Sequence, residues 1–339
     1  MGFIPFRVKF LLTLKEKPMA TEYPLTDSEF PLLNLRRVAG HIGAEVRDIA
    51  LSADLDDATF RQLNAALVKY KVLFFRQQPH LTDDAHQAFG ARFGRIVAHP
   101  TVPAPTGTQL FELDASKGGG RADSWHTDVT FVDAFPKISI LRGVTIPAYG
   151  GDTVWANTAR AYEQLPDELK RFAASLRAVH SNDYDYGAER VVVESTRLNH
   201  HKNVFVSSVW EAEHPVVHVH PVSGEKCLLL GHFFKRLVGF SSRESASLFE
   251  LLQNRVIRLD NTVRWQWQQD DVVIWDNRST QHYAVNDYGS QPRVVRRVTV
   301  EGETAVGVDG TRSRTIARGQ TAPQQVAANA DPRAKDVAS

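Results

Sequence analysis

The sequence predicts a mainly β fold, a β-sandwich or jelly roll with a few helices as buttresses. Short runs of β-branched and aromatic residues recur along most of the chain, which is typical of strands. Clusters of turn-forming residues, such as 147–151 and 221–224, separate these runs. Strands and helices do not alternate, and neither a GxGxxG nor a P-loop pattern is present. A βαβ nucleotide-binding fold is therefore not indicated.

The runs predicted as strands have the composition of buried or half-buried β-structure. They span 72–75, 138–144, 152–155, 216–219, 226–230, 263–267, 272–275 and 293–300. Other segments carry apolar residues at helical spacing and are predicted as helices: 56–70, 158–176 and 242–256. Asp56, at the start of the first of these, suits a helix N-terminus.

The body of the chain is predicted to be a single domain spanning 31–316, because no internal repeat is found. Residues 1–30 are expected to be an N-terminal extension. Its apolar stretch is short and is broken by Arg7 and Lys9, so a secretory signal is not expected. Residues 317–339 contain few large apolar residues and are predicted to be a disordered tail.

Composition limits the classes of partner. The chain has 40 basic and 39 acidic residues, which disfavours nucleic acid or a membrane surface as its main partner. The single cysteine, Cys227, lies in an apolar run and permits no intrachain disulfide. No apolar run is long enough to span a bilayer. We therefore expect a cytoplasmic protein that binds an anionic ligand through a few placed cations.

Two segments have the residue types of a metal site. His126 and Asp128 lie two positions apart in a strand-like run, where alternate side chains point to the same face. His282 follows 156 positions after His126. Two histidines and one carboxylate that leave other metal positions open are the arrangement of non-haem Fe(II) enzymes. Taken singly, each part has a structural alternative, namely a hydrogen-bonded strand pair or a buried structural histidine.

Two arginines accompany this candidate site. Arg293 and Arg297 follow His282 by 11 and 15 residues, in a run that otherwise has the composition of a buried strand. A buried guanidinium requires an anionic partner, and its planar fork suits a carboxylate or a sulfate. The alternative is a structural salt bridge to an internal Asp or Glu, a role that we expect for Arg296.

Several motifs together resemble the taurine dioxygenase family of Fe(II)/2-oxoglutarate enzymes: WHTDVTF, GGDTVWANT, HPVSG, WDNRSTQHYA and RVVRRVT. The similarity covers about residues 35–306. It implies a distorted double-stranded β-helix, a jelly roll, with O2 and 2-oxoglutarate as co-substrates and stimulation by ascorbate. Homo-oligomers are common in the family.

The resemblance also assigns roles to residues. His126, Asp128 and His282 correspond to the iron ligands. Arg293 and Thr153 correspond to the residues that bind the far carboxylate of 2-oxoglutarate.

The resemblance further implies how a substrate anion is bound. Arg297, His99 and the backbone amide of Val129 correspond to groups that bind a sulfonate or sulfate, and Phe233 to a residue of the substrate pocket. Without the family, His99 would be taken as an exposed histidine before a proline, and Phe233 as a core aromatic.

The stretches SNDYDYG, LLLGHFFKR and QPRVVRRVTV are most similar to the alkylsulfatase branch of the family. Taurine-specific members carry an Asn four residues before the first ligand histidine, where this chain has Ala122. An apolar residue there suits an aliphatic chain better than an ammonium group. The branch oxidises alkyl sulfate esters at the carbon bearing the sulfate, which gives an aldehyde, inorganic sulfate, succinate and CO2.

Other functions remain open from the sequence. Within the family, the alternatives are a taurine or other sulfonate dioxygenase and a phenoxyalkanoate dioxygenase. Outside it, a non-enzymatic jelly-roll binding protein would keep the β core without needing an open metal site. A zinc hydrolase of sulfate esters could use the same three ligands.

Overall fold

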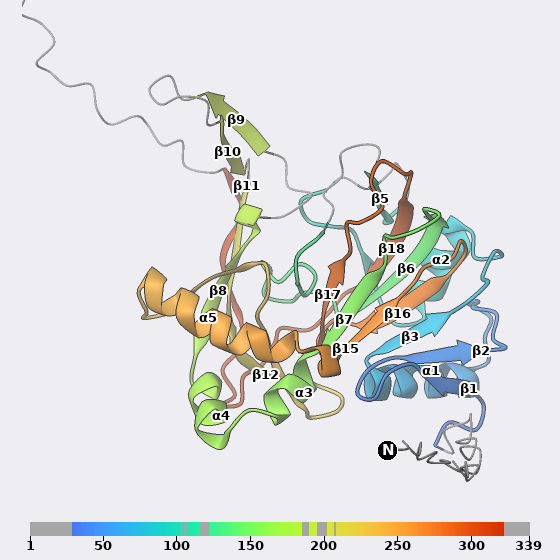
Figure 1. The fold of residues 1–339 in the computed structure, drawn as a ribbon, viewed down its shortest axis with the longest axis horizontal. Coiled ribbons are helices and arrows are strands. Elements are labelled where there is room, and N and C mark those ends of the chain that lie inside the picture. The colour runs from blue at the N-terminus through green and yellow to red at the C-terminus, as the bar shows by residue number, and fades with distance from the viewer. Residues whose placement is uncertain are drawn as a thin grey trace, which may run out of the picture.

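The computed structural model describes residues 29–321 except 103, 105–106, 116–121, 185–189, 195–201 and 207. Its largest sheet contains the strands nearest the N-terminus together with the central part of the core (Figure 1). In order across the sheet, these are β1 (Asn34–Arg37), β2 (Ala44–Arg47), β3 (Val72–Phe75), β16 (Val272–Asp276), β6 (Ile138–Thr145), β18 (Val294–Val300) and β4 (Ile96–Val97), and β5 (Phe111–Asp114) also pairs with β18.

Smaller sheets complete the β core. The second sheet has the order β14 (Phe234–Leu237), β8 (Arg177–Ser181), β11 (Ser208–Pro215) and β19 (Arg314–Thr321). The third has the order β15 (Thr262–Trp265), β7 (Thr153–Asn157) and β17 (Thr280–Ala284). Two hairpins are formed by β12 (Val217–Val219) with β13 (Lys226–Leu228), and by β9 (Arg190–Glu194) with β10 (Lys202–Val206). The mainly β class predicted from the sequence is confirmed.

Helices cover the outside of these sheets (Figure 1). They are α1 (Asp57–Tyr70), α2 (Asp83–Ala91), α3 (Thr158–Glu163), α4 (Asp167–Ala174), α5 (Ser242–Val256) and the short 3-10 helices η2 (Asn182–Tyr184) and η3 (Leu259–Asn261). Asp56 caps α1, as expected, by accepting from two backbone amides. Ser241 and Glu244 form a reciprocal capping box at the start of α5. No helix in the described part of the chain is long and apolar enough to cross a membrane.

The predicted strands all occur, with ends within two residues of those expected. The prediction of one helix over 158–176 is wrong. The segment contains α3 and α4, which are separated near Pro166. Proline lacks an amide hydrogen and disfavours a helical conformation at the residue before it, so the first helix ends and a second begins. Helix α2 was not predicted.

The predicted domain boundaries also need adjustment. β19 runs through residue 317 to residue 321 and pairs with β11, so the proposed tail begins inside a strand. Backbone pairing does not require the large apolar side chains whose scarcity suggested a tail. Phe30 is buried in the core rather than part of an extension. The rest of both terminal segments, 1–28 and 322–339, lies outside the described residues.

An aromatic cluster packs the large sheet against the third sheet. Phe74 stacks on Trp265 with ring centroids 4.2 Å apart, and Trp155 lies against Trp275 at 5.8 Å. Trp267 belongs to the same buried cluster. Separate apolar clusters hold α1 and α2 on the large sheet, and α3 and α5 on the strands around β12 and β13. Large, well-packed rings on both sides leave the third sheet little freedom to move.

Several histidines are buried beside this core. Both ring nitrogens of His214 are hydrogen-bonded. Nε2 donates to the Thr130 carbonyl at 2.7 Å, and Nδ1 lies 2.7 Å from Ser313 Oγ. His218 donates through Nε2 to the Arg278 carbonyl at 2.7 Å. Burial is the main cause that lowers the pKa of His214 and of His218 to about 4. Both side chains are therefore neutral in the folded protein at neutral pH.

These histidines predict an acid-sensitive fold. An unfolded chain takes up a proton on each histidine near pH 6.5, whereas the folded chain does so only near pH 4. Stability should thus be lost as the pH falls through this window, by about 2 kcal/mol per histidine between pH 7 and pH 5. Urea unfolding of the wild type and His218→Gln at several pH values measures the effect. The variant should lose less stability on acidification, whereas His41→Gln, at an exposed position, should behave as wild type. Equal pH slopes in all three proteins would contradict the assignment.

Candidate active site

Two hydrogen bonds join the backbones of His126 and His282. The amide of His126 donates to the carbonyl of His282 at 3.0 Å, and the amide of His282 donates to the carbonyl of His126 at 2.8 Å. His282 lies on β17, which pairs along its length with β7. The two histidines, far apart in the sequence, are therefore held side by side by a one-residue antiparallel bridge.

The prediction that residues 126–128 lie in a strand is wrong. Only His126 pairs, and the chain then enters a turn in which Val129 has a φ of 59°. Asn277 holds this turn: its Oδ1 accepts from the Asp128 amide at 2.9 Å, and its Nδ2 donates to the carbonyls of Asp128 and Pro136 at 3.2 and 2.8 Å. The turn, rather than strand alternation, brings Asp128 to the same point as His126. Asn277 was not singled out in the sequence, since an Asn before an Arg has no recognisable signature.

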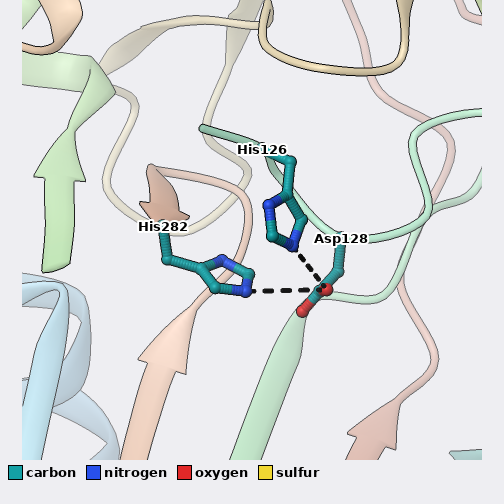
Figure 2. A group of neighbouring side chains, drawn as sticks. All are labelled: His126, Asp128 and His282. Atoms are coloured by element: carbon teal, nitrogen blue, oxygen red, sulfur yellow. Dashed lines mark ion pairs between the residues drawn. The ribbon is translucent and has the colours of Figure 1, made fainter. Parts of the chain in front are cut away.

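His126, Asp128 and His282 converge on one point (Figure 2). Asp128 Oδ1 lies 3.7 Å from His126 Nε2 and 3.8 Å from His282 Nε2. The three candidate ligand atoms lie within 4.8 Å of one another, and all three side chains are buried. His126 Nδ1 lies 2.7 Å from the carbonyl of Ser124 and must donate to it, because a carbonyl only accepts. In the neutral ring the other nitrogen, Nε2, therefore carries a free lone pair, which is available to a metal beside Asp128.

The charge state of the three groups suits metal binding. Burial lowers the pKa of His126, and burial followed by the neighbouring His126 lowers that of His282, so both imidazoles are neutral at neutral pH. Burial opposes ionisation of Asp128, but its interactions with neighbouring groups, of which the charge of Arg297 is the largest, outweigh burial and lower the pKa of the carboxyl. Arg297 Nη1 and Ser139 Oγ donate to its two oxygens at 2.5 and 2.9 Å. Two neutral imidazoles and a carboxylate are a fitting donor set for Fe(II), and they would also accept Zn²⁺.

The three residues border a cavity that also contains every other residue predicted for the site. The predicted residues that line it are His99, His126, Asp128, Val129, Thr153, Phe233, His282, Arg293 and Arg297. The sequence did not point to the remaining lining residues except Ala122: Phe111, Leu113, Leu141, Trp275, Ala284 and Val295. Most of these are apolar core positions, which carry no sign in the sequence that they face a cavity.

One side of the cavity holds a buried guanidinium that forms no salt bridge with a carboxylate of the described residues, although Asp152 interacts with it electrostatically. Arg293 is 7% exposed and donates through Nε to the Gly151 carbonyl at 3.2 Å. In the described part of the chain, no carboxylate forms a salt bridge with it, and burial lowers its pKa. Thr153 lies on the same side and accepts a hydrogen bond from Trp267 Nε1 at 2.9 Å. By contrast, Arg296 pairs with Asp83 and Glu112 outside the cavity, in the structural role expected for it.

A second cationic group lies near the metal-binding residues. The guanidinium of Arg297 lies 4.9 Å from the centroid of the Phe111 ring, and the ring of His99 stacks on Phe111 with the two centroids 4.9 Å apart. The Val129 amide has no acceptor among the residues that the structure describes. These groups can together bind a compact anion such as sulfate.

The rest of the cavity wall near the triad is apolar. Phe233 is 3% exposed, lies edge-on to His126 at 6.0 Å, and packs with Val129 and Phe131 in a small hydrophobic cluster. Ala122 borders the cavity and accepts a backbone hydrogen bond from Ala284 at 3.2 Å. No carboxylate or amide side chain occupies the position of Ala122, so an aliphatic group can lie there without burying an unpaired polar atom.

The chain is similar to proteins of known class. Residues 34–299 match the family described as taurine catabolism dioxygenase TauD, TfdA family. An alkylsulfatase of Acinetobacter baylyi is 59% identical over 89% of this chain and 94% of its own length. An alpha-ketoglutarate-dependent sulfate ester dioxygenase of Pseudomonas putida is 58% identical over 85% of this chain and 95% of its own length. The crystal structure of a taurine dioxygenase from Burkholderia xenovorans superposes with a TM-score of 0.71 at 37% identity, covering 86% of this chain and 96% of that one.

The geometry predicts that Asp128→Ala weakens metal binding by more than about 100-fold. Loss of a group that merely orients a ligand costs about 10- to 100-fold, and here a ligand itself is removed. Anaerobic calorimetric titration with Fe(II) measures the affinity, and circular dichroism reports whether the fold persists. Asp123→Ala is the matched control, because that carboxylate belongs to the same loop but is exposed and bonded to Asn286. Equal Fe(II) affinity in the folded Asp128→Ala variant and the wild type would contradict the assignment.

Proposed function

This chain belongs to the taurine catabolism dioxygenase TauD, TfdA family, and from this premise we propose that it oxidises alkyl sulfate esters with Fe(II), 2-oxoglutarate and O2. One observation carries the proposal: a single cavity joins a metal-binding triad to two buried arginines and an apolar wall. The relatives named alkylsulfatase and sulfate ester dioxygenase, at 59% and 58% identity, support the same substrate class.

We assign His126, Asp128 and His282 as the ligands of Fe(II). When bound, the metal supplies the activation of O2, which protein side chains cannot provide. The three side chains would hold the ion, and the Ser124 carbonyl and Ser139 hydroxyl orient two of them. Ascorbate, which keeps such an ion reduced, is expected to stimulate turnover. The proposal also includes a homo-oligomeric, cytoplasmic enzyme, as the family resemblance implies.

Arg293 and Thr153 are assigned to the distal carboxylate of 2-oxoglutarate. The uncompensated charge of Arg293 requires an anion, and its guanidinium suits a carboxylate. Thr153 adds a neutral donor from the neighbouring strand β7. Binding at the distal end leaves the keto acid end of the molecule directed toward the triad across the same cavity.

Arg297, His99 and the Val129 amide are assigned to the sulfate group of the substrate. The carbon next to the sulfate is then held beside the triad, with the alkyl chain against Phe233 and Ala122. This placement makes an otherwise bimolecular reaction an oriented one. The apolar wall does not provide a partner for the ammonium group of taurine, which favours the alkyl sulfate over that alternative.

One oxygen atom of O2 is inserted into the C–H bond of the carbon that bears the sulfate. The other oxygen atom enters 2-oxoglutarate, which loses CO2 and becomes succinate. The hydroxylated ester is a sulfated hemiacetal. Its bond between carbon and the sulfate oxygen breaks, the hydroxyl loses its proton, and an aldehyde and inorganic sulfate are released.

The first test is to incubate the protein with a medium-chain alkyl sulfate, Fe(II), ascorbate and 2-oxoglutarate, in air and without it. Sulfate and succinate should appear together, in equal amounts, only in air. If succinate formed instead with taurine or a phenoxyacetate, the substrate assignment would be wrong and the assignment of 2-oxoglutarate-dependent oxidation would stand. Sulfate released without air would indicate a hydrolase, and metal binding without O2 uptake would indicate a binding protein.

Alanine substitutions should separate the roles of the two arginines. Arg293→Ala should raise the KM for 2-oxoglutarate by about 10- to 100-fold, since hydrogen bonds to charged groups contribute about 1.5–3 kcal/mol. Arg297→Ala should raise the KM for the sulfate ester by a similar factor and leave 2-oxoglutarate binding within about twofold. Arg296→Ala is the control on the same strand, because its side chain pairs outside the cavity. The opposite pattern of KM changes would show that the two assignments are exchanged.

A further inference from the structure

Trp267 lies behind the proposed 2-oxoglutarate site. It follows the end of β15, is 4% exposed, and donates from its indole Nε1 to the Oγ1 of Thr153 at 2.9 Å. An indole N–H is a donor only. The oxygen of Thr153 must therefore be the acceptor in this hydrogen bond, whatever else the hydroxyl does.

The direction of the Thr153 proton follows from this contact. A hydroxyl has one proton to donate, and the partner at Trp267 cannot accept it. No acceptor for it occurs among the described residues, although the side chain is 2% exposed and borders the cavity. We propose that Trp267 is a positioning residue that presents the Thr153 hydroxyl as a donor to the distal carboxylate of the keto acid. This inference rests on the proposed function.

The indole is itself fixed. It belongs to the aromatic cluster between the large and third sheets. The next residue, Gln268, donates its amide to Asp271 Oδ2 at 2.8 Å, and the Asp271 carbonyl accepts from the Gly143 amide on β6 at 2.9 Å. The loop that carries Trp267 is thus tied to the large sheet, and packing in the buried aromatic cluster holds the indole in place.

A fixed donor behind the hydroxyl has a consequence for specificity. Because the orientation of the Thr153 proton is set before binding, little rotational freedom is lost when a carboxylate arrives. The hydroxyl and Arg293 then present two donors to the same part of the cavity, which suits an acceptor-only group and disfavours a keto acid whose far end is neutral or cationic. The structure therefore assigns selection of a dicarboxylic keto acid partly to Trp267, which itself does not touch the ligand.

The test compares keto acid binding by Trp267→Phe and wild type. Anaerobic calorimetry of the Fe(II)-loaded proteins gives the Kd for 2-oxoglutarate and for 2-oxobutyrate, which has no distal carboxylate. Trp267→Phe should weaken 2-oxoglutarate binding about fivefold to tenfold and leave 2-oxobutyrate binding within about twofold, as expected for loss of one hydrogen bond. In steady-state assays the same change should raise the KM for 2-oxoglutarate more than it lowers kcat.

Two further variants make the result decisive. Thr153→Val should weaken 2-oxoglutarate binding at least as much as Trp267→Phe, and the double variant should be no weaker than Thr153→Val alone. Trp265→Phe is the matched control, because its indole donates to Asp271 at 3.2 Å and not into the cavity. The inference is overturned if Trp267→Phe binds 2-oxoglutarate as wild type does, if the two effects add, or if 2-oxobutyrate binding weakens equally. Failure of the wild type to bind 2-oxoglutarate would instead overturn the proposed function.

Discussion

The site depends on the connection between β16 and β17, residues 276–280. Asn277 in this connection holds the turn that presents Asp128, and β17 carries His282, whose backbone bridges to His126. The connection is fixed in turn by Asp276, which is fully buried and accepts from the backbone amide and guanidinium of Arg278 and from His220. One buried carboxylate thus supports the segment to which all three candidate ligands are attached.

The distribution of charge explains how a nearly neutral chain can select anions. The formal net charge is +1, so no general field attracts them. The buried Arg293 forms no salt bridge in the described part of the chain, and desolvation, which outweighs the attraction of Asp152, makes its charge unfavourable until an anion arrives. Arg297 differs because Asp128 already pairs with it, and a divalent ion at the triad would compete for the same carboxylate oxygen. In the proposed site, the two cationic side chains that bind anions therefore come from one stretch of sequence.

Much of the fold was predictable because strand composition and helix caps are local signals, as the match at β3 and α5 illustrates. The metal-ligand candidates and the two arginines stand out by residue type, whereas Thr153, His99, Val129 and Phe233 were identified only through the family resemblance. The structure brings all nine residues to one cavity. Local signals failed where tertiary contacts decide. The turn after His126 depends on Asn277, about 150 residues away, and Trp267 is distinguished from the other buried tryptophans only by its partner.

The conformation of Val129 shows what this arrangement demands of the chain. A β-branched residue with a φ of 59° is disfavoured by about 1–2 kcal/mol, and packing against Phe131 and Phe233 together with the Asn277 contacts offsets this strain. Glycine would relax the backbone but would remove the apolar contact with Phe131 and Phe233, whereas a bulkier side chain would increase the strain. The position therefore has a narrow substitution tolerance, and variants selected only for thermal stability are liable to change it at the expense of anion binding.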